Sequence, residues 1–109
     1  MHVAHVGLIV KPVKRAEFFS TVERLLERMR RLPGCASCRL TVDSADSDSF
    51  VLTSDWENAT AFAGFMSSQL VHVLFGMRGL LEAEPRLTVD EVERRTEGWP
   101  PGSPGARVR

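Results

Sequence analysis

The 109-residue sequence has no excess of charge of either sign, because 14 lysines and arginines balance 14 aspartates and glutamates. A protein that binds nucleic acid normally carries a basic surplus, so we expect no nucleic-acid partner. No apolar run approaches the ~20 residues that a membrane-spanning helix needs, and we expect no membrane partner. The amino terminus also lacks the basic region and apolar core of a signal peptide. These absences predict a cytoplasmic protein.

Cysteine is scarce, with only Cys35 and Cys38 in the chain. Two cysteines are too few for the disulfide scaffold of a small secreted protein, which agrees with a reducing compartment. Their Cys-x-x-Cys spacing belongs to redox motifs when it opens a helix, whereas here it follows a predicted helix and enters a predicted strand. A zinc site would need two further ligands, and the sequence has no second pair. We therefore predict no metal site, and we expect Cys38 to lie in the packed core.

The spacing of apolar residues predicts one α+β domain with the order strand, helix, strand, strand, helix pair, strand. The strands are expected at residues 3–10, 38–42, 50–56 and 86–92, the first helix at 16–31, and the helix pair between 58 and 84. Such a βαββαβ chain gives a ferredoxin-like fold, a four-stranded antiparallel sheet with its helices on one side. We assign residues 1–96 to this domain and interpret the Pro/Gly-rich residues 97–109 as a disordered tail or an arm.

Helices on one side would leave the other face of the sheet uncovered. We expect this face to carry Val3, Ile9 and other apolar groups, a larger patch than a monomer usually exposes. Two such faces packed together would cover each other, and a net charge of zero offers little repulsion between subunits. The pattern therefore predicts a homodimer.

The histidines are the natural candidates for a base near neutral pH. His2 is expected to be exposed at the terminus. His5 shares a strand face with Gly7, which has no side chain and would leave space beside the imidazole. His72 shares a helix face with Phe75 and could reach a pocket. The alternatives are a His5 buried at a subunit interface and a His72 exposed on its helix.

Four further side chains are candidates for contact with a substrate. Arg39 could hold an anionic substrate oxygen, although a salt bridge with Asp55 or another acid of the hairpin is the favoured interpretation. Trp56 is expected to be core or pocket wall rather than a catalyst, and its indole N–H needs a hydrogen-bond partner. Phe65 and Phe75 belong to a set of phenylalanines that is mostly core, some of which could line a pocket for an aromatic molecule.

The order of motifs along the chain resembles the antibiotic biosynthesis monooxygenase family of dimeric α/β barrels. The motifs are Lys11-Pro12, Leu32-Pro33-Gly34-Cys35, Cys38-Arg39-Leu40, Asp43, Phe50-Val51-Leu52, Asp55-Trp56-Glu57-Asn58, Ser67-Ser68 and Pro85. The similarity covers roughly residues 3–95. It implies a homodimer with a small-molecule pocket in each subunit, between the sheet and the helices.

The resemblance also implies two kinds of activity. Some members are similar to quinol or polyketide-quinone oxygenases, which use no cofactor because the electron-rich substrate itself reduces oxygen. Others degrade haem with an asparagine, a tryptophan and a histidine, and here the corresponding positions hold His5 or Val6, Phe65 and Phe75. Haem degradation is therefore disfavoured. A glutamate that often precedes the family's tryptophan by two residues is Ser54 in this chain.

Three hypotheses follow for the function. The first is a cofactor-independent monooxygenase that oxidises a small aromatic, quinol-like or polyketide-type molecule with O2, with His5 or His72 as the base. The second is the same barrel holding a small ligand without turnover, and the third is a purely structural dimer. An enzyme needs a buried base that faces a cavity, a binding module needs a cavity without such a base, and a structural dimer needs no cavity.

Overall fold

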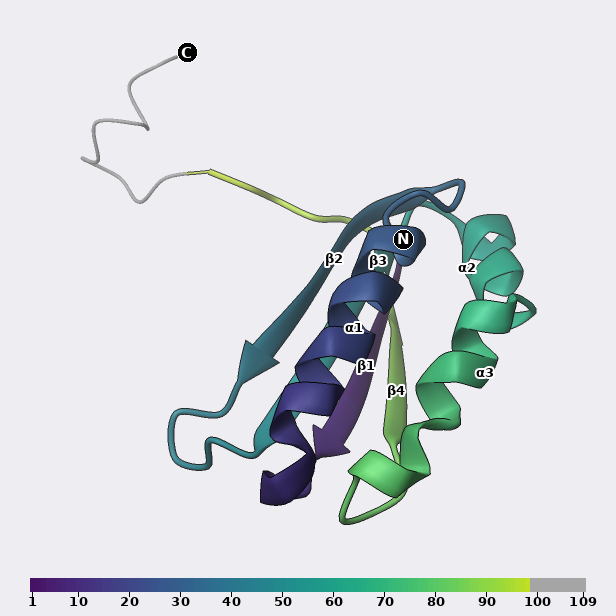
Figure 1. Cartoon of the computed structure of the whole chain (residues 1–109). Helices are drawn as coiled ribbons and strands as arrows, with labels where there is room; N and C mark the ends of the chain where they lie inside the picture. Colours follow the sequence, from purple (N-terminus) through teal and green to yellow (C-terminus); the bar gives the residue numbers. More distant parts are fainter. Residues whose placement is uncertain (99–109) are drawn as a thin grey trace.

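Four strands form a single antiparallel sheet in the computed structural model, which describes residues 1–98 (Figure 1). The strands are β1 (His2–Ile9), β2 (Cys35–Val42), β3 (Ser49–Trp56) and β4 (Arg86–Glu91). Their spatial order is β2-β3-β1-β4, which confirms the predicted ferredoxin-like α+β fold. Most of the expected tail, from residue 99 onward, lies outside the described residues, so the domain division after residue 96 stays a prediction.

The helices all lie on one side of this sheet (Figure 1). They are η1 (Pro12–Lys14), α1 (Arg15–Met29), α2 (Ala59–Met66), α3 (Gln69–Phe75) and η2 (Met77–Leu80). Asn58 begins α2, because its Oδ1 accepts a hydrogen bond from the backbone N–H of Ala61 at 2.8 Å. Ser67-Ser68 separates α2 from α3. β2 begins earlier than predicted, at Cys35, since a bulge before Ser37 extends its pairing with β3.

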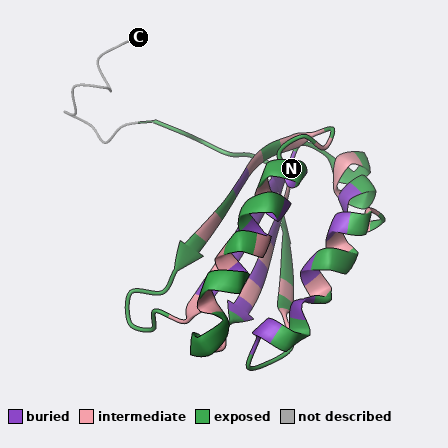
Figure 2. Cartoon of the chain, viewed as in Figure 1, coloured by how far each residue is buried: buried purple, intermediate pink, exposed green. Residues whose placement is uncertain are grey.

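The hydrophobic core fills the layer between the sheet and the helices (Figure 2). β1 contributes Ala4, Val6 and Leu8, the alternate residues that point toward the helices. The buried side chains of α1 recur every three or four residues, at Phe18, Val22, Leu25 and Met29, and so form one stripe along the helix. Burial of each large apolar side chain is worth about 1.5–3 kcal/mol, so this layer is the main source of stability.

The helix pair after β3 is short and strongly apolar. In the described part of the chain, no single helix is long and apolar enough to cross a membrane. Residues 59–66 and 69–80 reach the length and apolar composition of a membrane span only when the two segments are counted together, and the chain bends by 60° at the break between them. Phe65, Leu70 and Leu74 of this pair are buried in the core, which accounts for much of its apolar character.

The other face of the sheet carries no helix, and its composition differs from the prediction. Val3, Ile9 and Val51 are apolar there, and Ile9 is 45% exposed. The polar side chains of this open face are His5, Ser37, Arg39, Thr41, Thr53, Asp55, Arg86, Thr88 and Asp90. The expectation of a mainly apolar face is therefore wrong, because β2, β3 and β4 turn their polar residues away from the helices.

The edge strand β4 carries two apolar residues on the helix side of the sheet, opposite Val6 and Ala4 of β1. Leu87 is half-buried and packs against the core, but Val89 is exposed. β4 pairs only with β1 and ends the sheet, so its outer half has fewer neighbours to cover it.

Gly34 offers a test of how the turn after α1 packs against α2. Its φ is +78°, and a Cβ at this position would collide with the Cβ of Ala61. We expect Gly34→Ala to lower the free energy of unfolding by at least about 2 kcal/mol, through left-handed strain and overpacking. Urea denaturation measures this change.

Gly64→Ala is the matched control, because a Cβ at Gly64 of α2 meets nothing within 4 Å. Alanine in a helix interior should raise stability by about 0.5–1 kcal/mol. Equal effects of the two substitutions would contradict the packing of the turn against α2.

Candidate functional site

The predicted site residues fall on two opposite faces of the sheet. His5, Gly7 and Arg39 lie on the open face, where the strand alternation places them together. Trp56 and Phe65 lie on the other face, between the sheet and α2. The sequence-derived candidates therefore form two groups that cannot act at one reacting centre.

A row of polar side chains crosses the open face through His5. Arg39 of β2 and His5 of β1 both stand directly opposite Thr53 of β3, one on each side. His5 Nδ1 lies 3.3 Å from Thr53 Oγ1, and His5 Nε2 lies 3.3 Å from Asp90 Oδ2 on β4. A carboxylate can only accept a hydrogen bond, whereas a hydroxyl can donate or accept, so the tautomer with the proton on Nε2 suits both neighbours. The His5 side chain is 37% exposed.

Gly7 was expected to leave space beside His5. It stands opposite Arg86 of β4, and a Cβ at Gly7 would meet the Cβ of Arg86 at 3.8 Å. This is ordinary van der Waals contact, so the space beside Gly7 ends at the Arg86 side chain and does not form an enclosed cavity.

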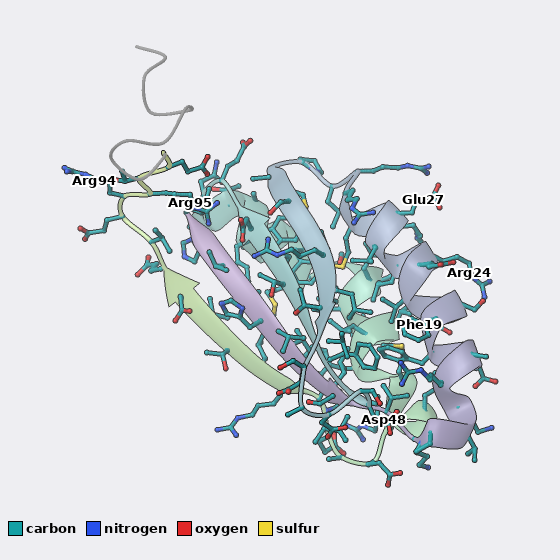
Figure 3. The ribbon with its side chains drawn as sticks, turned by 90° about the vertical axis from the view of Figure 1, so that its left-hand side faces the viewer. Phe19, Arg24, Glu27, Asp48, Arg94 and Arg95 are labelled. Carbon is teal, nitrogen blue, oxygen red and sulfur yellow. The ribbon has the colours of Figure 1, made fainter. Side chains whose placement is uncertain are left out.

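Asp55 forms an ion pair on this face, but with a different arginine from the one expected. Its Oδ2 accepts hydrogen bonds from Ser37 Oγ at 2.9 Å and from Arg95 Nη1 at 3.0 Å. Arg95 lies after β4, and Figure 3 shows it directed toward the sheet while Arg94 points away. The expected salt bridge from Arg39 to Asp55 is therefore absent among residues 1–98. Sequence reasoning missed Arg95 because 40 residues separate it from its partner.

A polar cavity of about 710 Å³ lies at this end of the open face. Its lining includes Ser37, Arg39, Asp55 and Arg95. It brings the predicted Arg39 together with the three residues of the Asp55 cluster. The volume falls in the range of small-molecule sites, about 300–1,000 Å³.

On the helix side, Trp56 is fully buried and stacks on Phe65, with ring centroids 4.7 Å apart and planes 16° apart. Its indole N–H donates to Ser54 Oγ at 3.0 Å, which supplies the partner that a buried indole needs. Ser54 stands where the resemblance leads one to expect a glutamate, and here it supports the tryptophan. Trp56 is thus part of the core.

The remaining helix candidates lie apart from both groups. His72 is exposed on α3, the second of the alternatives left open for it. Phe75, at the end of the same helix, is half-buried and packs against the core. Neither residue lines one of the two cavities described in this section.

His2 was expected to be exposed, and that expectation is wrong. Its side chain is 16% exposed and stacks on Phe62 of α2, with centroids 5.3 Å and planes 10° apart. Nε2 lies 3.5 Å from Glu91 Oε1, whereas Nδ1 is buried without a hydrogen-bond partner among the described residues. The strand begins at His2, and the alternation that buries Ala4 and Val6 would have placed it under α2.

An apolar cavity of about 640 Å³ lies between the turn after α1 and helix α2. Pro33, Gly34, Ala61 and Phe65 are among the residues that line it, and Glu57 is its one ionisable lining residue. No histidine of the described chain faces it. It can hold an apolar molecule, but it offers no base near neutral pH.

The two cysteines pack in or against the hydrophobic core. Cys38 is buried, and its Sγ lies 3.9 Å from Met29 Sδ, which confirms its expected place in the core. Burial raises the pKa of the Cys38 thiol to about 12, and burial is also the main cause of a raised pKa at Cys35. Among residues 1–98, no group of three histidine, cysteine or acidic side chains could hold a metal ion.

Comparison with known proteins decides the family. The family model for antibiotic biosynthesis monooxygenases matches residues 1–75. The chain belongs to this family. Members of this family have a monooxygenase-type or small-ligand-binding function, and this coarse description applies to the chain. The match also confirms the resemblance seen in the motifs. No curated protein matches the chain.

Solved structures share the fold of this antibiotic biosynthesis monooxygenase family member at low sequence identity. A Deinococcus radiodurans protein assigned to the same monooxygenases has a TM-score of 0.80 at 16% identity, over 89% of this chain and 97% of its own. SnoaB, a cofactor-independent oxygenase from Streptomyces nogalater, has a TM-score of 0.70 at 20% identity, over 86% of this chain and 95% of its own. Likeness at this level establishes the fold.

The raised pKa of Cys38 predicts a thiol that reacts poorly in the folded protein. At pH 8 we expect the Cys35→Ser variant, which keeps only Cys38, to react with a disulfide reagent at least about 100-fold more slowly when folded than in urea. Absorbance of the released thiolate measures the rate. Cys38→Ser, which keeps the half-buried Cys35, is the comparison and should react faster in the folded state. Rapid reaction at Cys38 would revive a redox role for the pair.

Proposed function

We propose that this protein oxidises a small aromatic, quinol-like or polyketide-type molecule with O2, without a cofactor, at the open face of the sheet. The observation that carries the proposal is the arrangement of His5 between Asp90 and Thr53, with Arg39 on the far side of Thr53. It supplies a base and an anion-stabilising cation in one row. Family membership supports the same class of chemistry.

His5 is the proposed base. Asp90 Oδ2 lies 3.3 Å from Nε2, where its charge favours the tautomer with the proton on Nε2 and stabilises the imidazolium that forms when Nδ1 takes a proton. The Thr53 hydroxyl contacts Nδ1, so a phenol or enol O–H reaches the base by displacing that hydroxyl or by passing its proton through it. The Arg39 guanidinium then stabilises the resulting phenolate or enolate.

The deprotonated substrate is the reductant for oxygen. For an anthrone-type substrate, a CH2 group and one O2 give a C=O group and one water. The carbon loses four electrons and both oxygen atoms gain two each, so the reaction needs no other electron donor. The protein's part is to generate the anion and to keep it beside oxygen in a sheltered place.

A second copy of the chain is the proposed shelter. Ile9 and Val51 give the open face an apolar portion, and Arg86 and Asp90 give it charges of both signs that a rotated copy can complement. Two chains packed through these faces would enclose the His5 row from water. The homodimer is therefore part of this proposal.

Binding without turnover is the alternative function. It is favoured by the apolar cavity of about 640 Å³ beside Gly34 and Phe65, which has a suitable volume and no histidine. On this alternative the ligand would lie under α2, on the opposite side of the sheet from His5.

Oxygen consumption with a panel of hydroquinones and anthrones tests the choice. We expect His5→Ala to lower kcat by about 10²–10⁴-fold, the usual contribution of a general base. His72→Ala is the matched control and should leave kcat unchanged, since His72 is exposed on α3. Uptake that survives His5→Ala would exclude His5 as the base. Absence of uptake with every substrate, together with ligand binding that Gly64→Phe blocks, would establish the alternative.

The subunit contact has its own test. Light scattering at micromolar concentration should give twice the mass of one chain. Ile9→Lys should reduce it to the mass of one chain, because it places a charge in the buried contact. Val13→Lys, at an exposed position of η1 away from the sheet face, should stay dimeric. A wild-type protein with the mass of one chain would refute the proposed shelter.

A further inference from the structure

A nearly buried carboxylate stands at the end of the open face. Asp55 is only 3% exposed, and its Oδ1 is buried without a partner among residues 1–98. Burial of a charge is costly unless an opposite charge compensates for it. The compensation comes from Arg95, whose Nη1 lies 3.0 Å from Oδ2, with Ser37 Oγ donating to the same oxygen at 2.9 Å. Asp55 therefore fixes the position of Arg95.

Arg95 keeps part of its guanidinium available. Nη1 makes its close contact with Asp55 and a longer one of 4.0 Å with Glu97, while Arg95 is still 39% exposed. Arg39 lines the same cavity, and its guanidinium makes no ion pair or hydrogen bond with any residue of the described chain. Two guanidinium groups and two carboxylates thus border one cavity of about 710 Å³. Asp55 is buried and paired with Arg95, whereas the Glu97 side chain is 79% exposed to water and lies only at the longer distance.

We propose that this cavity binds the carboxylate of a hydroxylated aromatic acid, with Arg95 as the principal carboxylate-binding residue and Arg39 beside it. The planar guanidinium presents paired N–H donors that match a carboxylate. Asp55 and Ser37 are positioning residues, because they hold Arg95 in place before the ligand arrives and so reduce the ordering cost of binding.

The spacing of the sheet supports an aromatic ring between the two ends of the ligand. Thr53, which contacts His5, and Asp55, which holds Arg95, are two residues apart on the same face of β3. Successive residues of a strand advance by about 3.4 Å, so the two rows are about 7 Å apart. One benzene ring with a hydroxyl and a carboxylate at opposite positions spans nearly this distance. The inference deepens the proposed function, on which its reacting end at His5 rests.

Calorimetric titration under nitrogen tests the binding without any turnover. The probes are 4-hydroxybenzoate and 4-hydroxybenzamide, which have nearly the same shape and differ in charge. We expect the acid to bind wild-type protein at least about tenfold more tightly than the amide, since hydrogen bonds between two charged groups are stronger than those to a neutral amide. Equal affinity for the two probes, or no binding of the acid, would overturn the proposal.

Arg95→Ala should weaken binding of 4-hydroxybenzoate by at least about tenfold. Arg94→Ala is the matched control, because Arg94 has the same charge, follows the same strand and points away from the sheet (Figure 3). It should change the affinity by less than about twofold, consistent with the small worth of exposed charges. Equal losses in the two variants would indicate general charge attraction and refute a site at Arg95.

Asp55→Asn tests the positioning role separately. It keeps the shape of the side chain but removes the charge that holds Arg95, so affinity for the acid should fall while affinity for the amide stays the same. Circular dichroism checks that the variant is folded, and Ser37→Ala gives a milder second test of the same cluster. Acid binding that depends on Arg95, without oxygen consumption by any substrate, would refute the proposed oxidation and leave this site standing.

Discussion

One constraint decides which residues lie on each face of the sheet: the alternation of side chains along the central strand β1. Ala4, Val6 and Leu8 point toward the helices and are buried, whereas His5 and Gly7 point the other way. A slip of one residue in the pairing with β3 would exchange the two sets and place His5 in the core. The apolar residues of β1 therefore fix the position of the residues between them. The place of His5 on the open face depends on the packing of the core against the opposite face of the strand.

Strand β4 extends this division to the acidic side chains. Asp90 lies beside His5 on the open face, and the next residue, Glu91, lies beside His2 on the helix side, where its own side chain stays exposed. Each histidine of β1 therefore has a carboxylate of β4 near its Nε2. The two histidines differ in the surroundings of their other ring nitrogen, Nδ1. Thr53 contacts Nδ1 of His5, whereas Nδ1 of His2 is buried without a partner in the described chain.

The open face of the sheet contains buried polar residues in this chain. Thr53 and Asp55 are buried although no helix covers their face, because Arg39, Ser37, His5 and the segment that follows β4 surround them. Buried polar groups of this kind need partners, and several residues of the cluster hold one another. A surface organised in this way can recognise a polar, charged molecule, while the apolar Ile9 and Val51 on the same face are available to the proposed subunit contact.

The sequence alone determined the order of the elements and the place of the first helix, because these depend on residues close together in the chain. It also placed His5 and Gly7 on one strand face and Cys38 in the core. Only the tertiary structure decided what covers each face, since that depends on contacts between distant segments. The pairing of Asp55 with Arg95 rather than Arg39 and the burial of His2 under Phe62 are contacts of this kind. Local periodicity shows which way a side chain points, but the opposing side chain comes from a part of the chain whose position only folding fixes.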